Sequence, residues 1–122
     1  MTMKNNLKRI VITGGAGFIG SNLCRKFLQE GAEKILIIDD LSTGKIKNIE
    51  DLMKLDEIEF IKSRVEDVKN LNETLSNFDF CFHLAAGVGV QYIMENVSKA
   101  LLTNIEATHL MIESCKVNNL PI

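Results

Sequence analysis

The sequence lacks the patterns that would assign it to several broad classes of protein. Its three cysteines, Cys24, Cys81 and Cys115, stand far apart and match neither a zinc-binding spacing nor a disulfide framework. They are expected to be small buried hydrophobic side chains. No apolar run approaches the length that crosses a membrane, and the first residues contain no apolar core of a signal peptide. We therefore expect a protein of the reducing cytoplasm.

The charge of the chain also excludes a class of partner. A net charge of -2 and the absence of a basic aromatic surface argue against nucleic-acid binding. The 122 residues suit one domain with a core of its own, and they contain no internal linker, repeat or low-complexity tract. The sequence thus predicts a single domain that binds neither nucleic acid nor a membrane.

The most informative feature that is present is a glycine-rich stretch, residues 13–20, which reads TGGAGFIG. Residues 10–12 before it are apolar and predict a buried strand. After it, apolar side chains recur on one face of a predicted helix, at Ile19, Leu23, Phe27 and Leu28. Such a turn leaves backbone N–H groups at a helix N-terminus free to bind a pyrophosphate. One glycine suits the tight turn, one the close approach of phosphate, and Gly20 the packing of helix on strand.

A carboxylate follows the next predicted strand. The apolar run 35–38 ends at Asp39 and Asp40, about 20 residues beyond Gly20, where a dinucleotide-binding fold places an acid. A carboxylate there accepts hydrogen bonds from the adenosine ribose and repels a 2′-phosphate. Because no arginine stands nearby to bind that phosphate, the sequence favours NAD over NADP. The alternative is that Asp39 only caps the turn after the strand.

Short strands and helices alternate along the rest of the chain. We expect a turn at 41–44, a helix around 46–55, a strand at 58–62, a loop at 65–68, a short helix near 71–76, a strand at 80–84 and a long helix over about 98–117. The long helix has a broad apolar face made of Leu101, Leu102, Ile105, Met111, Ile112 and Cys115, while Glu106 and Glu113 point elsewhere. The alternation predicts an α/β fold: a Rossmann-like, doubly wound parallel sheet of about four strands with helices on both faces.

These motifs resemble the N-terminal half of an extended short-chain dehydrogenase/reductase, in the branch of NAD-dependent nucleotide-sugar epimerases and dehydratases. The residues that carry the resemblance stand in the family's order across nearly the whole chain: Gly14, Gly17, Phe18, Ile19 and Gly20, then residues 39–44, Asp67 and Val68, residues 83–86, and Asn104. The resemblance is specific for the family and not for one substrate. It implies that residues 1–122 are an incomplete NAD-binding Rossmann domain, truncated before the fifth strand and without the substrate-binding region.

The resemblance also implies which residues surround NAD. Gly14, Gly17, Phe18 and Ile19 would border the pyrophosphate, and Asp39, Asp40, Leu41, Ser42 and Gly44 would surround the adenosine ribose. Asp67 and Val68 would contact the adenine. Leu84, Ala85, Ala86 and Asn104 would lie at the nicotinamide end. Two of these residues have a second, structural interpretation, and so does His83 beside them. Asp67 could be a simple loop or cap residue, and Asn104 could bridge helices. His83 is expected to be a hydrogen-bonded structural residue.

The catalytic pair of the family is missing from this chain. Members use the tyrosine of a Tyr-x-x-x-Lys pair, in which the lysine lowers the pKa of the phenol. Here the single tyrosine, Tyr92, is followed four residues later by Asn96. The sequence ends at 118–122, where the fifth strand is expected to begin. We therefore expect no catalytic residue in this chain and no turnover by the chain alone.

Two functions remain open at this point. The first is the NAD-binding portion of an enzyme that takes a hydride from a sugar carbon of a nucleotide-sugar and returns it. The second is a stand-alone, non-catalytic NAD-binding or regulatory module, which would have to protect the edge of the fourth strand. A methyltransferase that binds S-adenosylmethionine fits the motifs less well. A homo-oligomer would form through the last helix or through the exposed sheet edge.

Overall fold

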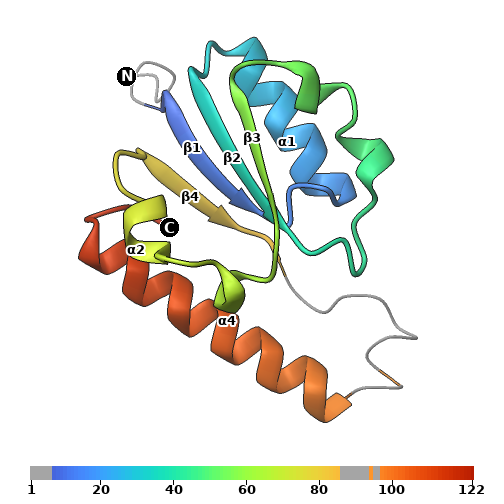
Figure 1. Cartoon of the computed structure of the whole chain (residues 1–122), viewed down its shortest axis with the longest axis vertical. Helices are drawn as coiled ribbons and strands as arrows, with labels where there is room; N and C mark the ends of the chain where they lie inside the picture. The colour runs from blue at the N-terminus through green and yellow to red at the C-terminus, as the bar shows by residue number, and fades with distance from the viewer. Residues whose placement is uncertain (1–6, 86–93, 95–96) are drawn as a thin grey trace.

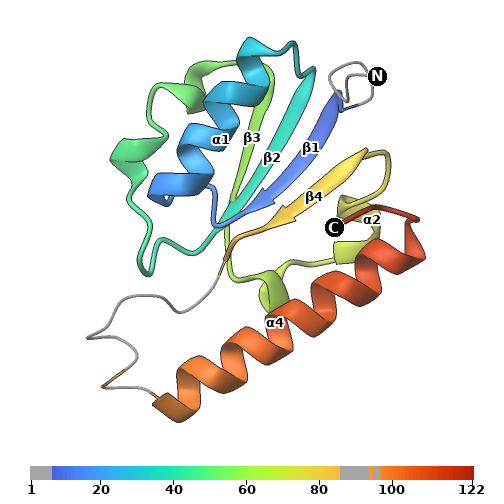
Figure 2. The same cartoon turned by 180° about the vertical axis from the view of Figure 1, so that it is seen from behind.

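A computed structural model describes residues 7–85, 94 and 97–122, which form a parallel four-stranded sheet between two layers of helices (Figures 1 and 2). The strands are β1 (Arg9–Thr13), β2 (Lys34–Asp39), β3 (Ile58–Lys62) and β4 (Phe80–His83), in the spatial order β3-β2-β1-β4. Each neighbouring pair is parallel. The α/β fold and its Rossmann-like sheet are thereby confirmed.

The two central strands are buried on both faces, as an all-parallel sheet requires. On one face Ile10, Ile12, Ile35 and Ile37 join the core beneath α1 (Phe18–Gln29). On the other face Val11, Leu36, Ile38 and Cys81 join the core beneath α4 (Val97–Val117). Successive side chains of a strand point to opposite faces, so these unbroken apolar runs supply both cores at once.

The helical segments between the strands are shorter than the sequence predicts. The helix expected around 46–55 is wrong: this segment forms two 3₁₀ turns, η2 (Ile46–Asn48) and η3 (Leu52–Lys54). Only Ile49 and Leu52 of its apolar residues are buried, three positions apart. That spacing suits tight turns, in which side chains at i and i+3 align, and cannot support a full helical face. On the other face, η4 (Val65–Asp67) and α2 (Leu71–Thr74) lead into β4.

The helix α1 lies where the sequence predicts it, but one residue of its predicted buried face is exposed. Its buried residues are Gly20, Ser21 and Cys24, and Leu23, Phe27 and Leu28 pack against the same core. Ile19 was expected on this face but is 71% exposed. Small residues at the contact let α1 approach the strands closely.

The helix α4 is covered by the protein along only part of its apolar face. Ala107, Met111 and Cys115 are buried against the sheet. Four residues of the expected apolar face are exposed: Leu101, Leu102, Ile105 and Ile112. The first turns of α4 extend away from the sheet in both views, so nothing described covers them (Figures 1 and 2). Even so, in the described part of the chain no helix is long and apolar enough to span a membrane.

After α4 the chain returns to the outer edge of the sheet. Leu120 is buried, and the carbonyl oxygen of Pro121 accepts a hydrogen bond of 2.8 Å from the Cys81 N–H of β4. This contact lies where the sequence predicts the start of a fifth strand, although the described residues include no fifth strand. One backbone group of the edge strand is thereby paired.

The three cysteines are buried and free, as expected. Burial raises the pKa of the Cys24 thiol to about 12 and raises the pKa values of Cys81 and Cys115 as well. These thiols are therefore protonated at neutral pH and act as small packing residues.

His83, at the end of β4, joins the end of β1 to α4 through two hydrogen bonds, as expected of a structural residue. Its Nδ1 lies 2.7 Å from the Thr13 hydroxyl, and its Nε2 lies 3.1 Å from the Thr108 hydroxyl. The Thr13 hydroxyl oxygen also accepts the Ala85 N–H at 3.1 Å. Both ring nitrogens of His83 therefore have a hydroxyl partner.

We predict that acid lowers the stability of the fold because of His83. Burial lowers the pKa of His83 from its ordinary 6.5. Between the two values the unfolded chain binds a proton that the folded chain does not, so stability decreases as the pH drops from about 6.5 through the folded-state pKa. Urea unfolding at several pH values measures this slope.

The dependence of the unfolding free energy on pH should be weaker in His83→Gln than in the wild type. It should be unchanged in the control His109→Gln, since His109 is exposed on α4. If the unfolding free energy of His83→Gln fell with acid as steeply as that of the wild type, His83 would not be the cause.

Candidate functional site

The carboxyl ends of the four strands meet at one edge of the sheet, and most of the predicted residues lie in the loops that leave it. Thr13 is in register with Ile38 and His83, and Asp39 is in register with Lys62. In open α/β sheets, ligands bind outside this edge. The topology therefore brings loops from distant parts of the sequence to one place.

The glycine turn begins with a backbone conformation that glycine favours. Gly14 has φ +73°, and its N–H donates to the carbonyl oxygen of Ile38 at 2.8 Å. A Cβ on Gly14 would lie 2.8 Å from the Ala85 nitrogen, so the ends of β1 and β4 meet backbone to backbone. A Cβ on Gly20 would overlap the Gly14 carbonyl oxygen. The helix can start this close to the strand only because both positions are glycine.

The N-terminus of α1 is open. Gly17 is its N-cap residue, no side chain among the described residues caps it, and its first turn contains no acidic residue. The N–H groups of that turn have no partner within the helix. Among the residues that the structure describes, a Cβ on Gly17 would contact only the Gly14 carbonyl oxygen, at 3.3 Å, and Phe18 is 81% exposed. Open N–H groups at the positive end of a helix are suited to binding an anion.

Asp39 points at the glycine turn and is 7% exposed. Its Oδ2 accepts the Ala16 N–H at 2.9 Å, and its Oδ1 accepts the Leu41 N–H at 2.8 Å. A Cβ on Gly44 would lie 2.9 Å from the same Oδ2. Asp39 thus caps its own turn and also holds the glycine turn. Each carboxylate oxygen keeps capacity for a further donor, such as a ribose hydroxyl.

Asp40 and Ser42 form a local turn beside Asp39. One oxygen of Asp40 accepts both the Ser42 N–H, at 2.9 Å, and the Ser42 hydroxyl, at 2.7 Å. These bonds shape the loop that follows β2. The contact of Asp40 and Ser42 with the adenosine ribose remains a prediction.

The end of β4 also joins the glycine turn. The Leu84 N–H donates to the Thr13 carbonyl oxygen at 3.1 Å, and the Ala85 N–H donates to the Thr13 hydroxyl at 3.1 Å. These contacts place the two residues directly beside Gly14. Ala86, Tyr92 and Asn96 lie outside the residues that the structure describes.

Three predicted residues lie apart from this group. Asp67 is exposed in η4, and Val68 lines a hollow of about 390 Å³ between η4, α2 and α4. Asn104 is half-buried on α4, which covers the face of the sheet opposite α1 (Figures 1 and 2). Their roles at the adenine and at the nicotinamide stay predictions. Within the described ranges, no cluster of His, Cys, Asp and Glu side chains could hold a metal ion.

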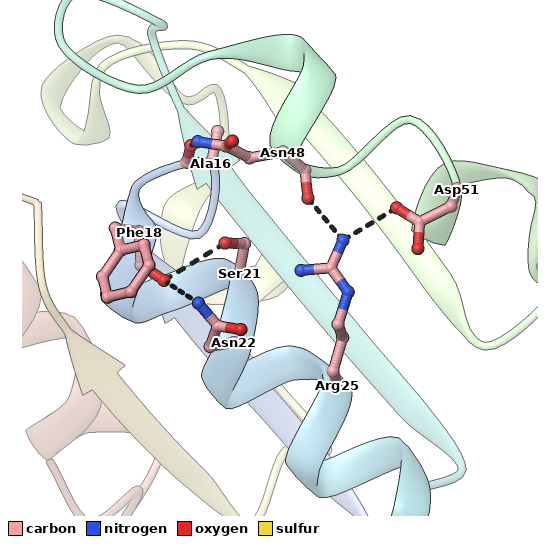
Figure 3. A network of polar contacts seen from close by, with 7 residues as sticks. All are labelled: Ala16, Phe18, Ser21, Asn22, Arg25, Asn48 and Asp51. Atoms are coloured by element: carbon pink, nitrogen blue, oxygen red, sulfur yellow. Dashed lines mark hydrogen bonds and ion pairs between the residues drawn. The ribbon is translucent and has the colours of Figure 1, made fainter.

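The structure adds a network that the sequence analysis missed (Figure 3). The side-chain amide of Asn48 donates to the Ala16 carbonyl oxygen at 2.9 Å, and Arg25 donates to the Asn48 carbonyl oxygen at 2.8 Å. Arg25 also pairs with Asp51 at 2.8 Å, and this hydrogen bond lowers the pKa of the Asp51 carboxyl. The sequence analysis missed this network because its members lie far apart in the sequence and no local pattern links them.

Comparisons with known proteins agree with this geometry. The family model described as GDP-mannose 4,6 dehydratase matches residues 11–121. A UDP-N-acetyl-alpha-D-glucosaminuronate decarboxylase from Bacillus cytotoxicus is 36% identical over 107 residues, which cover 88% of this chain and 32% of that protein.

Solved structures give the same result. The UDP-N-acetylglucosamine 4-epimerase from Methanobrevibacter ruminantium M1, in complex with UDP-N-acetylmuramic acid, has a TM-score of 0.82 and 34% identity, over 93% of this chain and 35% of its own. The UDP-glucuronic acid 4-epimerase from Bacillus cereus, in complex with UDP-glucuronic acid and NAD, has a TM-score of 0.78 and 34% identity, over 88% of this chain and 36% of its own.

The chain spans about a third of the length of the curated relatives that it matches. The matched region begins in β1 and continues past α4. The TM-scores of 0.82 and 0.78 show that the solved structures share the fold of this chain. The chain therefore belongs to the GDP-mannose 4,6 dehydratase family, among the nucleotide-sugar epimerases and dehydratases of the extended short-chain dehydrogenase/reductase type.

Proposed function

We propose that this chain is the NAD-binding part of a nucleotide-sugar epimerase or dehydratase. The observation that carries the proposal is the open N-terminus of α1, held in place by the buried carboxylate of Asp39. The Bacillus cereus relative, in complex with NAD, supports NAD as the ligand.

The residues at this edge fit the chemistry of NAD. The N–H groups at the start of α1, near Gly17, Phe18 and Ile19, would bind the pyrophosphate. Asp39 would accept the adenosine ribose hydroxyls, and the backbone at Leu84 and Ala85 would pass beneath the nicotinamide ribose. When bound, the nicotinamide supplies reversible hydride transfer.

The substrate of the complete enzyme would be a nucleotide-sugar, and the chain would work in the cytoplasm. Its sequence offers no Tyr-x-x-x-Lys pair to act as a base. We therefore propose that the chain binds NAD without turning over a sugar. Homo-oligomers would form through the exposed residues of α4, such as Leu101 and Ile105, or through the edge of β4.

The second candidate is a stand-alone NAD-binding module. Such a module must protect the edge of β4, and the Pro121 carbonyl oxygen already pairs with the Cys81 N–H there. Both candidates share the same NAD site, and they differ in whether further chain completes the enzyme.

Calorimetric titration of the chain tests the shared site. We expect binding of NAD, weaker binding of NADP, no binding of S-adenosylmethionine, and no epimerase or dehydratase turnover with nucleotide-sugars. Binding of S-adenosylmethionine without NAD would refute the proposal and favour a methyltransferase.

Replacing Asp39 with alanine should weaken NAD binding by about 1–3 kcal/mol, because a charged acceptor for the ribose hydroxyls is lost. The preference for NAD over NADP should narrow as well, since the negative charge that repels the 2′-phosphate is gone. Calorimetry with both cofactors measures the two effects.

The matched control is Asp79→Ala, which also removes a carboxylate that accepts two backbone N–H groups, from Lys8 and Arg9 at 2.9 and 2.8 Å. Asp79 precedes β4 and therefore lies at the opposite, amino-terminal edge of the sheet. An equal loss of NAD affinity in both variants would remove Asp39 from the site.

Replacing Gly17 with valine should nearly abolish NAD binding while the chain still folds. Gly17 has φ -77° and ψ 174°, a conformation that valine adopts readily, and among the described residues a Cβ there has one close contact, with the Gly14 carbonyl oxygen at 3.3 Å, which a small shift relieves. The branched side chain would instead occupy the space in front of the open N–H groups. Calorimetry and a thermal melt measure binding and folding, with Gly17→Ala as an intermediate; retained binding would place the pyrophosphate elsewhere.

A further inference from the structure

The Ala16 residue of the glycine turn is held at both its backbone groups by side chains from other segments. Its N–H donates to Asp39 Oδ2 at 2.9 Å. Its carbonyl oxygen accepts the side-chain amide of Asn48 at 2.9 Å and the backbone N–H of Lys45 at 3.0 Å. Ala16 itself is fully buried. Two successive peptide groups of the turn are therefore fixed in orientation.

The direction of the Ala16 carbonyl affects the charge presented to an anion. Bound to Asn48 and Lys45, the oxygen with its partial negative charge points at the 45–48 loop. The neighbouring Gly17 N–H donates to the Gly14 carbonyl oxygen at 3.1 Å, which tightens the turn. A carbonyl that rotated out of this position could face a pyrophosphate and would repel it. The Asn48 amide thus helps to keep the start of α1 electropositive.

Asn48 is in turn held by Arg25 of α1. The segment around it has only the two short turns η2 and η3, so it has little backbone structure of its own. Buried Ile49 anchors it to the core, and the Arg25 guanidinium bridges the Asn48 carbonyl and Asp51 (Figure 3). The Arg25–Asp51 pair is exposed, and such pairs contribute little to stability. Its effect is to fix where the Asn48 amide lies.

We propose that Asn48 is a positioning residue for the pyrophosphate of NAD, acting through the Ala16 carbonyl and supported by Arg25. This inference rests on the proposed function. Asn48 need not touch the cofactor, because it acts on the peptide groups that lead into the anion-binding helix.

The experiment compares Asn48→Ala and the isosteric Asn48→Asp with the control Asn118→Ala. The Asn118 amide also donates to a distant carbonyl oxygen at 2.9 Å, that of Asn72, but on the α4 side of the sheet. Loss of the Asn48 donor should weaken NAD and ADP by about tenfold, the equivalent of one hydrogen bond. Binding of adenosine, which has no phosphate, should not change, and Asn118→Ala should bind all three as the wild type does.

The backbone amide signals of residues 14–17 in the ligand-free protein provide a second measurement. They should shift in both Asn48 variants and stay in place in Asn118→Ala. If the wild type binds NAD and the Asn48 variants bind it equally well, this inference fails and the proposed function stands. The inference also fails if adenosine weakens as much as ADP, because the role is then only structural. A wild type that does not bind NAD would overturn both.

Discussion

The structure depends on one buried carboxylate that joins the ends of two parallel strands. Asp39 ends β2, and its side chain holds the glycine turn that connects β1 to α1 through the Ala16 N–H. Burying a carboxylate is costly unless its oxygens are hydrogen-bonded. Here two backbone N–H groups, at 2.9 and 2.8 Å, satisfy it. That same carboxylate sets the position of the open helix N-terminus, so the sheet and the candidate site share one constraint.

The loops around this point support one another. Gly14 brings the turn against the end of β4, where Thr13 accepts the Leu84 and Ala85 N–H groups and His83 contacts the Thr13 hydroxyl. On the other side, the Asn48 amide fixes the far end of the turn. Backbone groups at the carboxyl edge are thereby oriented before any ligand arrives, which lowers the entropic cost of binding.

The two faces of the sheet differ in how completely they are covered. On the α1 face the core closes with small residues such as Cys24. On the α4 face Met111 and Cys115 are buried, but Leu101, Leu102 and Ile105 stay exposed. Exposed apolar residues on one helix mark a surface suited to contact with further protein. This agrees with a chain that spans about a third of its curated relatives.

The sequence alone determined the strands, the parallel α/β class and the glycine turn, because strand burial and helix starts leave local patterns. It did not determine which apolar residues are covered: Ile19 and Ile105 fit helical faces, but the sheet does not reach them. It also predicted a helix where η2 and η3 form. The contact of Asn48 with Ala16 joins residues 32 positions apart, so no local pattern encodes it. Only the packing of the folded chain decided which distant polar groups met.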